Sequence, residues 1–239
     1  MDWRHDADYA FCEQLDLAGW AWQFLRREPE YRADFRWFIS LWHQLEAEYG
    51  TPPQRDFFRW KQDPRAWRAE AEITGCGTDL CPGENDQVLI ECWMGAKWGF
   101  RKFPIDPTIN LPEELAWREY PINIEVLNPA SISERPQAPE KLALNFDLSL
   151  PLPAQLEAAK LQLITSRQLR TQAGVLPPRN VREGASIWRL WLRMLDALEA
   201  RETLDSIGDT FTLTNLNSEV TAARAMCGGG YRRILMLEH

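Results

Sequence analysis

A chain of 239 residues is long enough for one large domain or two of modest size. Hydrophobic residues make up 45% of it, which provides for a core and excludes disorder over most of the length. No apolar run approaches the roughly 20 residues that cross a bilayer, and the opening Met-Asp-Trp-Arg-His-Asp is too polar for a signal peptide, so we expect a cytoplasmic protein that does not contact the membrane.

The formal charge of −8 is unevenly distributed. Residues 141–239 hold 12 Lys+Arg and 10 Asp+Glu, a balance of +2; the remaining 15 (27 − 12) and 25 (35 − 10) give residues 1–140 a balance of −10. An acidic front and a mildly basic rear suit a regulator whose two ends meet different partners. They equally suit an acidic protein-binding module, and charge does not separate the two.

Apolar spacing predicts three helices at the front of the chain. The first covers 8–27 and ends at Glu28-Pro29; the second runs from Pro29 or Glu30 to Glu48; a short aromatic helix covers 54–62. Ten of the twelve tryptophans precede residue 120. We interpret them mainly as core, because large aromatic side chains fill small domains, with a protein-binding face or base stacking as alternatives.

Strands are predicted next. Residues 63–86 are rich in Gly, Pro and Asp and predict a loop. The apolar runs 88–93 and 98–103 predict a β-hairpin across the turn 94–97, and 122–127 predicts another strand.

Behind this region, three prolines in 128–140 predict an exposed linker. Strict alternation of apolar residues from Leu142 to Leu150 then predicts a half-buried strand. A helix is predicted from Ala154 to about Gln172.

Five cysteines, an odd number, predict reduced intracellular thiols in a chain of this size. Cys76, Cys81 and Cys92 hint at a metal site, but they lack a Cys-x-x-Cys pair, and His5 and His43 lie far away in sequence. We expect structural or loop cysteines and no metal, with a zinc site as the alternative.

Catalytic motifs are missing from the sequence. It contains no phosphate-binding glycine loop and no Gly-x-Ser-x-Gly elbow. Gly228-Gly229-Gly230 follows a predicted helix instead of opening one, so we interpret it as a helix stop. We expect a protein that is not an enzyme and needs no cofactor.

The last sixty residues predict a compact DNA-reading unit. Apolar residues repeat at intervals of three and four from Ile187 to Leu198, which marks one helix. A short second helix fits Leu204 to Phe211, and a third runs from Leu216 to Met226. A bracing helix, a polar-faced helix and a basic exit are the parts of a helix-turn-helix. Three amphipathic helices unrelated to DNA are the alternative.

The outward face of the third helix predicts contacts with bases. Its side chains are short and neutral or basic, and Glu219 is its sole carboxylate. We predict that double-stranded promoter or operator DNA is contacted by Asn215, Asn217, Ser218, Thr221 and Arg224. Arg232 and Arg233 are the predicted phosphate contacts.

Two stretches resemble known families. Trp3-Arg4, Asp8-Tyr9 and the run from Leu15 to Arg27 resemble the N-terminal domain of proteobacterial regulators named "transcriptional regulator domain". The run from Leu144 to Leu156, the helix from Arg189 to Ala200 and the ending Gly-Gly-Tyr-Arg-Arg-Ile-Leu resemble a variant helix-turn-helix domain. Activators and antiactivators of integrative and conjugative element transfer carry that domain. The resemblance implies that the two-domain form activates excision and transfer genes, and that a single-domain form is an antiactivator that grips the activator.

These observations predict an α+β chain that is mostly α. An acidic, Trp-rich regulator domain with a small β-hairpin covers 1–127, a linker covers 128–140, and a variant helix-turn-helix domain preceded by a strand covers 141–236; residues 237–239 look like the remnant of an expression tag. We predict a DNA-binding activator whose front domain contacts an antiactivator or RNA polymerase. The alternative is an acidic protein-binding regulator, such as an antiactivator, that does not itself bind DNA.

Overall fold

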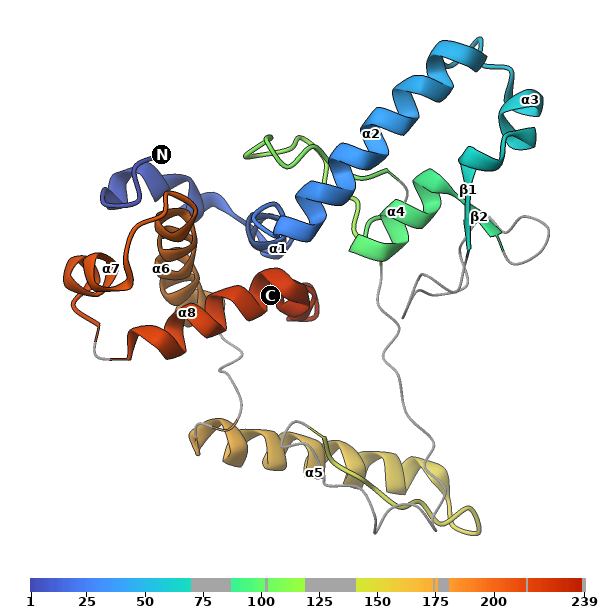
Figure 1. Ribbon diagram of the computed structural model, residues 1–239. Coiled ribbons are helices and arrows are strands. Elements are labelled where there is room, and N and C mark those ends of the chain that lie inside the picture. Colours follow the sequence, from blue (N-terminus) through green and yellow to red (C-terminus); the bar gives the residue numbers. More distant parts are fainter. Residues whose placement is uncertain are drawn as a thin grey trace. The chain divides into compact units, whose positions relative to one another are not determined.

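The computed structural model describes residues 1–69, 87–101, 103–118, 141–173, 175, 181–213 and 215–237. The chain forms two units: Met1–Pro121 together with Ala185–His239, and Ile122–Gly184. The described residues are mostly helical with one small antiparallel sheet, which confirms the predicted fold class (Figure 1). Of the predicted elements, the strand 122–127 and the linker 128–140 lie outside the described residues.

The first predicted helix, 8–27, is in fact two elements. A 3-10 helix, Asp6–Gln14, is followed by α1, Leu17–Leu25, and the backbone between them is extended. Asp16 makes the break because its carboxylate accepts the backbone N–H of Gly19 at 2.7 Å and caps α1. Eight of the nine residues of α1 are buried, so this helix is surrounded by protein.

The next two helices are confirmed. α2, Pro29–Tyr49, begins with proline at its first turn and buries one stripe, consisting of Tyr31, Phe35, Phe38, Trp42 and Leu45. α3, Phe57–Gln62, lies beyond the far end of α2 (Figure 1). Nine of the twelve tryptophans are buried, which confirms their interpretation as core.

The predicted hairpin of 88–93 and 98–103 is wrong. The sheet instead pairs β1, Trp67–Ala69, with β2, Gln87–Leu89, and the predicted turn lies inside α4, Ile90–Trp98. Eight of the nine residues of α4 are buried, so its apolar run has no polar face from which a helical period can be read.

The rear helices follow the predicted order. They are α6, Val181–Glu199; α7, Leu204–Phe211; and α8, Leu216–Ala225. The glycines break the helix as predicted, because Gly228 and Gly229 leave helical geometry within Met226–Gly230; a further short helix, α9, Tyr231–Ile234, then follows the kink. Gly229 carries the kink with φ 124°, a conformation open to glycine.

In the smaller unit, the predicted helix is confirmed as α5, Leu152–Gln172. The predicted strand 142–150 is wrong: residues 141–146 form no ladder among the described residues, and a turn occupies 148–150. Asp147 and Gln155 exchange hydrogen bonds that fold this segment against the start of α5. In neither unit do the described residues include a helix long and apolar enough to span a bilayer.

Candidate nucleic-acid interface

The three rear helices share a core with the beginning of the chain. Trp3, 3% exposed, packs into a cluster with Met194 and Ala197 of α6, Ile207 of α7 and Val220 of α8. Its ring lies 5.8 Å from that of Phe211. The scaffold of α8 is therefore completed by a side chain from the third position of the sequence.

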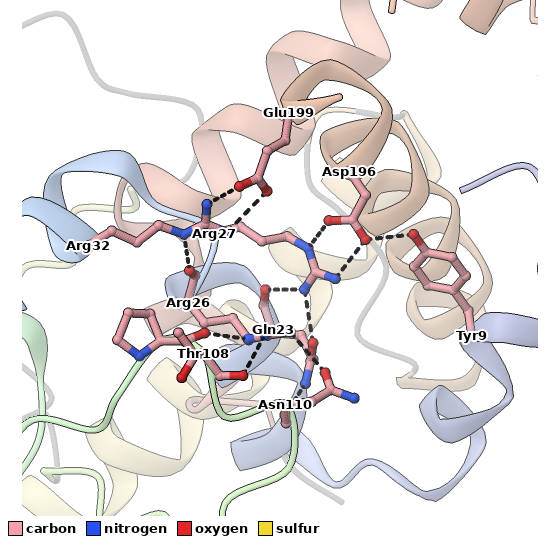
Figure 2. Close-up of polar contacts among 10 residues, drawn as sticks. Tyr9, Gln23, Arg26, Arg27, Arg32, Thr108, Asn110, Asp196 and Glu199 are labelled. Carbon is pink, nitrogen blue, oxygen red and sulfur yellow. Dashed lines mark hydrogen bonds and ion pairs between the residues drawn. The ribbon is translucent and has the colours of Figure 1, made fainter. Parts of the chain in front are cut away.

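A polar network joins α1 to α6 (Figure 2). Arg27, at the end of α1, donates to both carboxylate oxygens of Asp196 in α6 and to the side chain and backbone of Gln23. Tyr9 donates its hydroxyl to the same carboxylate at 2.6 Å. Burial alone would raise the pKa of Asp196, but the hydrogen bonds and charge of Arg27 outweigh it and hold the pKa below its usual value.

Two arginines of α6 also make contacts with the N-terminal residues. Arg193 donates to the backbone carbonyls of Trp3 and Arg4, and Arg189 pairs with Asp6 at 2.7 Å. The network missed by sequence reasoning thus includes residues separated by more than 160 positions. No spacing pattern predicts such contacts, because periodicity reports only the element in which a residue lies.

α7 ends in a residue with a left-handed backbone conformation. Thr212, which ends α7, adopts φ 53°, a left-handed conformation that is costly for a β-branched residue. A Cβ at Gly208 would lie 3.4 Å from the side chain of Leu216, so α7 and the start of α8 pack against each other at this position. A short helix, a turn and a second helix of ten residues follow one another in the predicted order; that they act as a helix-turn-helix stays a prediction.

The predicted base-reading residues all lie on the surface of this unit. The exposed set consists of Asn215, Asn217, Ser218, Thr221 and Arg224. Asn215 is the N-cap residue of α8, but its side chain makes no capping hydrogen bond. The hydroxyl of Thr221 donates to the backbone carbonyl of Asn217 at 2.8 Å, which fixes its rotamer on the helix.

Glu219, the single carboxylate of α8, is turned toward α6. Its Oε2 accepts the indole N–H of Trp191 at 2.7 Å. The hydrogen bond holds the negative charge beside the helix that packs against α8. The exposed residues of α8 therefore carry amides, hydroxyls and one guanidinium, and this is a surface that phosphate does not repel.

The two predicted phosphate contacts differ in their surroundings. Arg233 is exposed. Arg232 is half-buried, and its guanidinium donates to the backbone carbonyl of Lys97 at 2.6 Å. Tyr231 donates its hydroxyl to the carbonyl of Trp98 at 2.8 Å, so α9 is anchored on the end of α4. Arg232 therefore has a structural task, and Arg233 is the more accessible cation.

The zinc alternative concerns three cysteines, of which the described part of the chain contains one. There, no group of His, Cys, Asp or Glu residues is arranged to hold a metal ion. Cys92 is buried, and the other two cysteines of the zinc alternative, Cys76 and Cys81, lie outside the described residues.

Comparison with known families bears on the front segment, which supplies Trp3, Tyr9 and Arg27 to this assembly. Residues 2–60 match the proteobacterial transcriptional regulator-like domain. The match covers 59 of 239 residues, from the N-terminus into α3, and it confirms the resemblance seen at the front of the chain. The family description indicates a transcriptional regulator. The searches of curated proteins and of solved structures gave no match.

Proposed function

We propose that this chain is a DNA-binding transcriptional regulator that places α8 in the major groove. The observation that carries the proposal is the exposed face of α8, from which the only carboxylate of the helix is held away by Trp191. Asparagine amides match the edge of adenine and arginine matches that of guanine, so this face has the groups that direct base readout requires.

The finer role follows from the sequence resemblance. We propose an activator of excision and transfer genes of a mobile element, acting on promoter DNA in the cytoplasm. The front of the chain would contact RNA polymerase or an antiactivator. Its charge of −10 over residues 1–140 supports a protein partner there, because phosphate repels an acidic surface.

The test of DNA binding uses the full-length chain. Duplexes are first enriched on the wild-type protein from a random library, and affinities are then measured by fluorescence anisotropy. Asn217→Ala and Arg224→Ala should each weaken binding to the enriched duplex by about 1–3 kcal/mol, the value of one base contact. Arg36→Ala, which removes an exposed arginine from α2, is the matched control and should leave affinity unchanged. Failure to enrich any duplex would overturn the proposal.

A second candidate function is an acidic regulator that binds another protein and not DNA. The negative balance of residues 1–140 is the observation that favours it. A reporter with the enriched duplex upstream separates the candidates. An activator raises transcription and loses that effect with Arg224→Ala, whereas a DNA-independent regulator keeps its effect with the same variant.

A further inference from the structure

Two neighbouring phenylalanines of α3 project from the surface, and we call this pair the aromatic knob. Phe57 and Phe58 of α3 are 43% and 75% exposed. Lys61 places its ammonium 4.8 Å from the ring centroid of Phe57, and Arg59 is also exposed. Phenylalanine beside arginine is a typical composition for the centre of a protein interface, where aromatic side chains contribute much of the binding energy.

The knob is flanked by basic residues although the sequence around it is acidic. Beside the two rings, the exposed cations Arg59 and Lys61 outnumber the exposed carboxylate of Asp56, whereas Arg55 and Arg65 pair with Glu46 and Glu48 of α2. A partner for this knob should therefore offer a recess with apolar side chains and with carboxylates at its rim.

The same chain contains a recess of this kind at the start of α1. It has a volume of about 310 Å³, and its lining combines polar groups with apolar side chains in similar measure, the latter including Leu15, Trp22 and Leu111. Asp16 and Glu113 supply two acidic groups to its lining. The indole N–H of Trp22 donates to the carbonyl of Ile109 at 3.0 Å, which fixes one wall against the other. Leu111 is 52% exposed, so the recess is bordered by accessible apolar surface.

The knob does not reach the recess of its own molecule. α1 and α3 lie at opposite ends of α2 (Figure 1). With 21 residues, α2 separates them by about 31 Å at 1.5 Å per residue.

We propose that Phe58 of one molecule inserts into the recess of a second copy, with Arg59 and Lys61 beside Asp16 and Glu113. The contact uses two different surfaces, so it is heterologous and links molecules head to tail. The opposite charges at the rim attract each other. Because salt screens this attraction, the affinity of self-association should fall as the ionic strength rises. The self-association is independent of DNA binding, because neither surface includes a residue of α8.

Two single-site variants test the contact in the full chain by sedimentation velocity over a concentration series. Phe58→Ser removes the knob, and Leu111→Arg obstructs the recess with a cation. Wild-type protein should form dimers and larger species, and each variant alone should associate at least tenfold more weakly. A mixture of the two should form dimers and nothing larger, because one intact knob meets one intact recess.

Matched controls separate this result from misfolding. Leu148→Ser changes a large apolar residue of the smaller unit that is 87% exposed, the highest value for such a residue in the described part of the chain, and should leave association unchanged. Arg59→Glu should weaken association, and adding Glu113→Arg should restore it. Circular dichroism and thermal melting establish that each variant is folded. A monomeric wild type at every concentration, a folded Phe58→Ser variant that associates normally, or a mixture that stays monomeric would each overturn the proposal.

Discussion

The guanidinium of Arg27 donates two hydrogen bonds to the carboxylate of Asp196, at 2.6 Å from Nε to Oδ1 and 2.9 Å from Nη2 to Oδ2. The two side chains are 4% and 19% exposed. Because such a pair is largely shielded from water, removing one partner leaves the other with an uncompensated charge. The pair therefore makes the segment that matches the regulator domain part of the support of α6.

Arg27→Met should lower the free energy of unfolding by about 3–5 kcal/mol, the usual cost of breaking a buried ion pair. Arg32→Ala is the matched control, because Arg32 pairs with Glu199 on the same helix, but these side chains are 31% and 56% exposed. It should cost no more than about 1 kcal/mol. Urea denaturation measures both variants, and equal losses would contradict the role given to burial.

Acid should weaken the junction that Asp63 makes after α3. Its carboxylate accepts hydrogen bonds from Arg65 and Tyr49, and the Arg65 guanidinium is the main reason why its pKa falls from 3.8 to about 2. A depressed carboxyl pKa stabilises the fold fully above 3.8, and the contribution is lost as pH falls toward about 2. Asp63→Asn should flatten the pH dependence of the free energy of unfolding in that window. A slope identical to that of wild type would show that Asp63 does not contribute.

Arg232 and Arg233 should separate stability from DNA affinity. Arg233→Ala should reduce binding to specific and random duplexes alike and lower the slope of log affinity against log salt by about 0.9, as expected for one phosphate contact. Arg232→Ala should instead lower the melting temperature, because the Arg232 guanidinium anchors α9 on the carbonyl of Lys97. Anisotropy titrations over a salt series and thermal melts measure the two effects. Loss of only the specific complex with Arg233→Ala would refute the phosphate assignment.

Thr212→Gly should stabilise the protein. The left-handed conformation at φ 53° costs a residue with a Cβ roughly 1–2 kcal/mol, and glycine gives back about 0.5–1 kcal/mol through its more flexible unfolded state. The expected gain is thus about 0.5–1 kcal/mol in urea denaturation. Thr210→Gly, two residues earlier inside α7, should destabilise the protein instead. A loss at Thr212 would show that its side chain matters more than its backbone.

Local periodicity was sufficient to predict α2, α5, α7 and α8 closely, since each is an amphipathic or polar-faced helix with clear breaks. It failed for α4, which is buried on all sides. It also failed for the strand 142–150, because alternating residues indicate a strand only where another strand pairs with them.

The exposed face of α8 could also be predicted from the sequence, because the pattern of polar residues on a helix determines which of them are exposed to solvent. The orientation of the Glu219 side chain toward α6 could not be predicted, because it depends on Trp191 from another helix. The surroundings of Arg232 could not be predicted for the same reason: the sequence shows its charge and not the carbonyl of Lys97 beside it, and its contact with phosphate stays a prediction. Contacts between residues that are far apart in the sequence leave no pattern in the neighbouring residues from which they could be predicted.

The place of Trp3 imposes an order on biosynthesis. Its cluster includes Val220, so 217 further residues (220 − 3) must be translated before the cluster can close. At about 5–20 residues per second, this takes on the order of 10–40 seconds. For that time the indole of Trp3 has no finished site and stays available as the kind of transiently exposed apolar group that makes chaperones necessary. α6, α7 and α8 therefore close over an indole that leaves the ribosome long before they do.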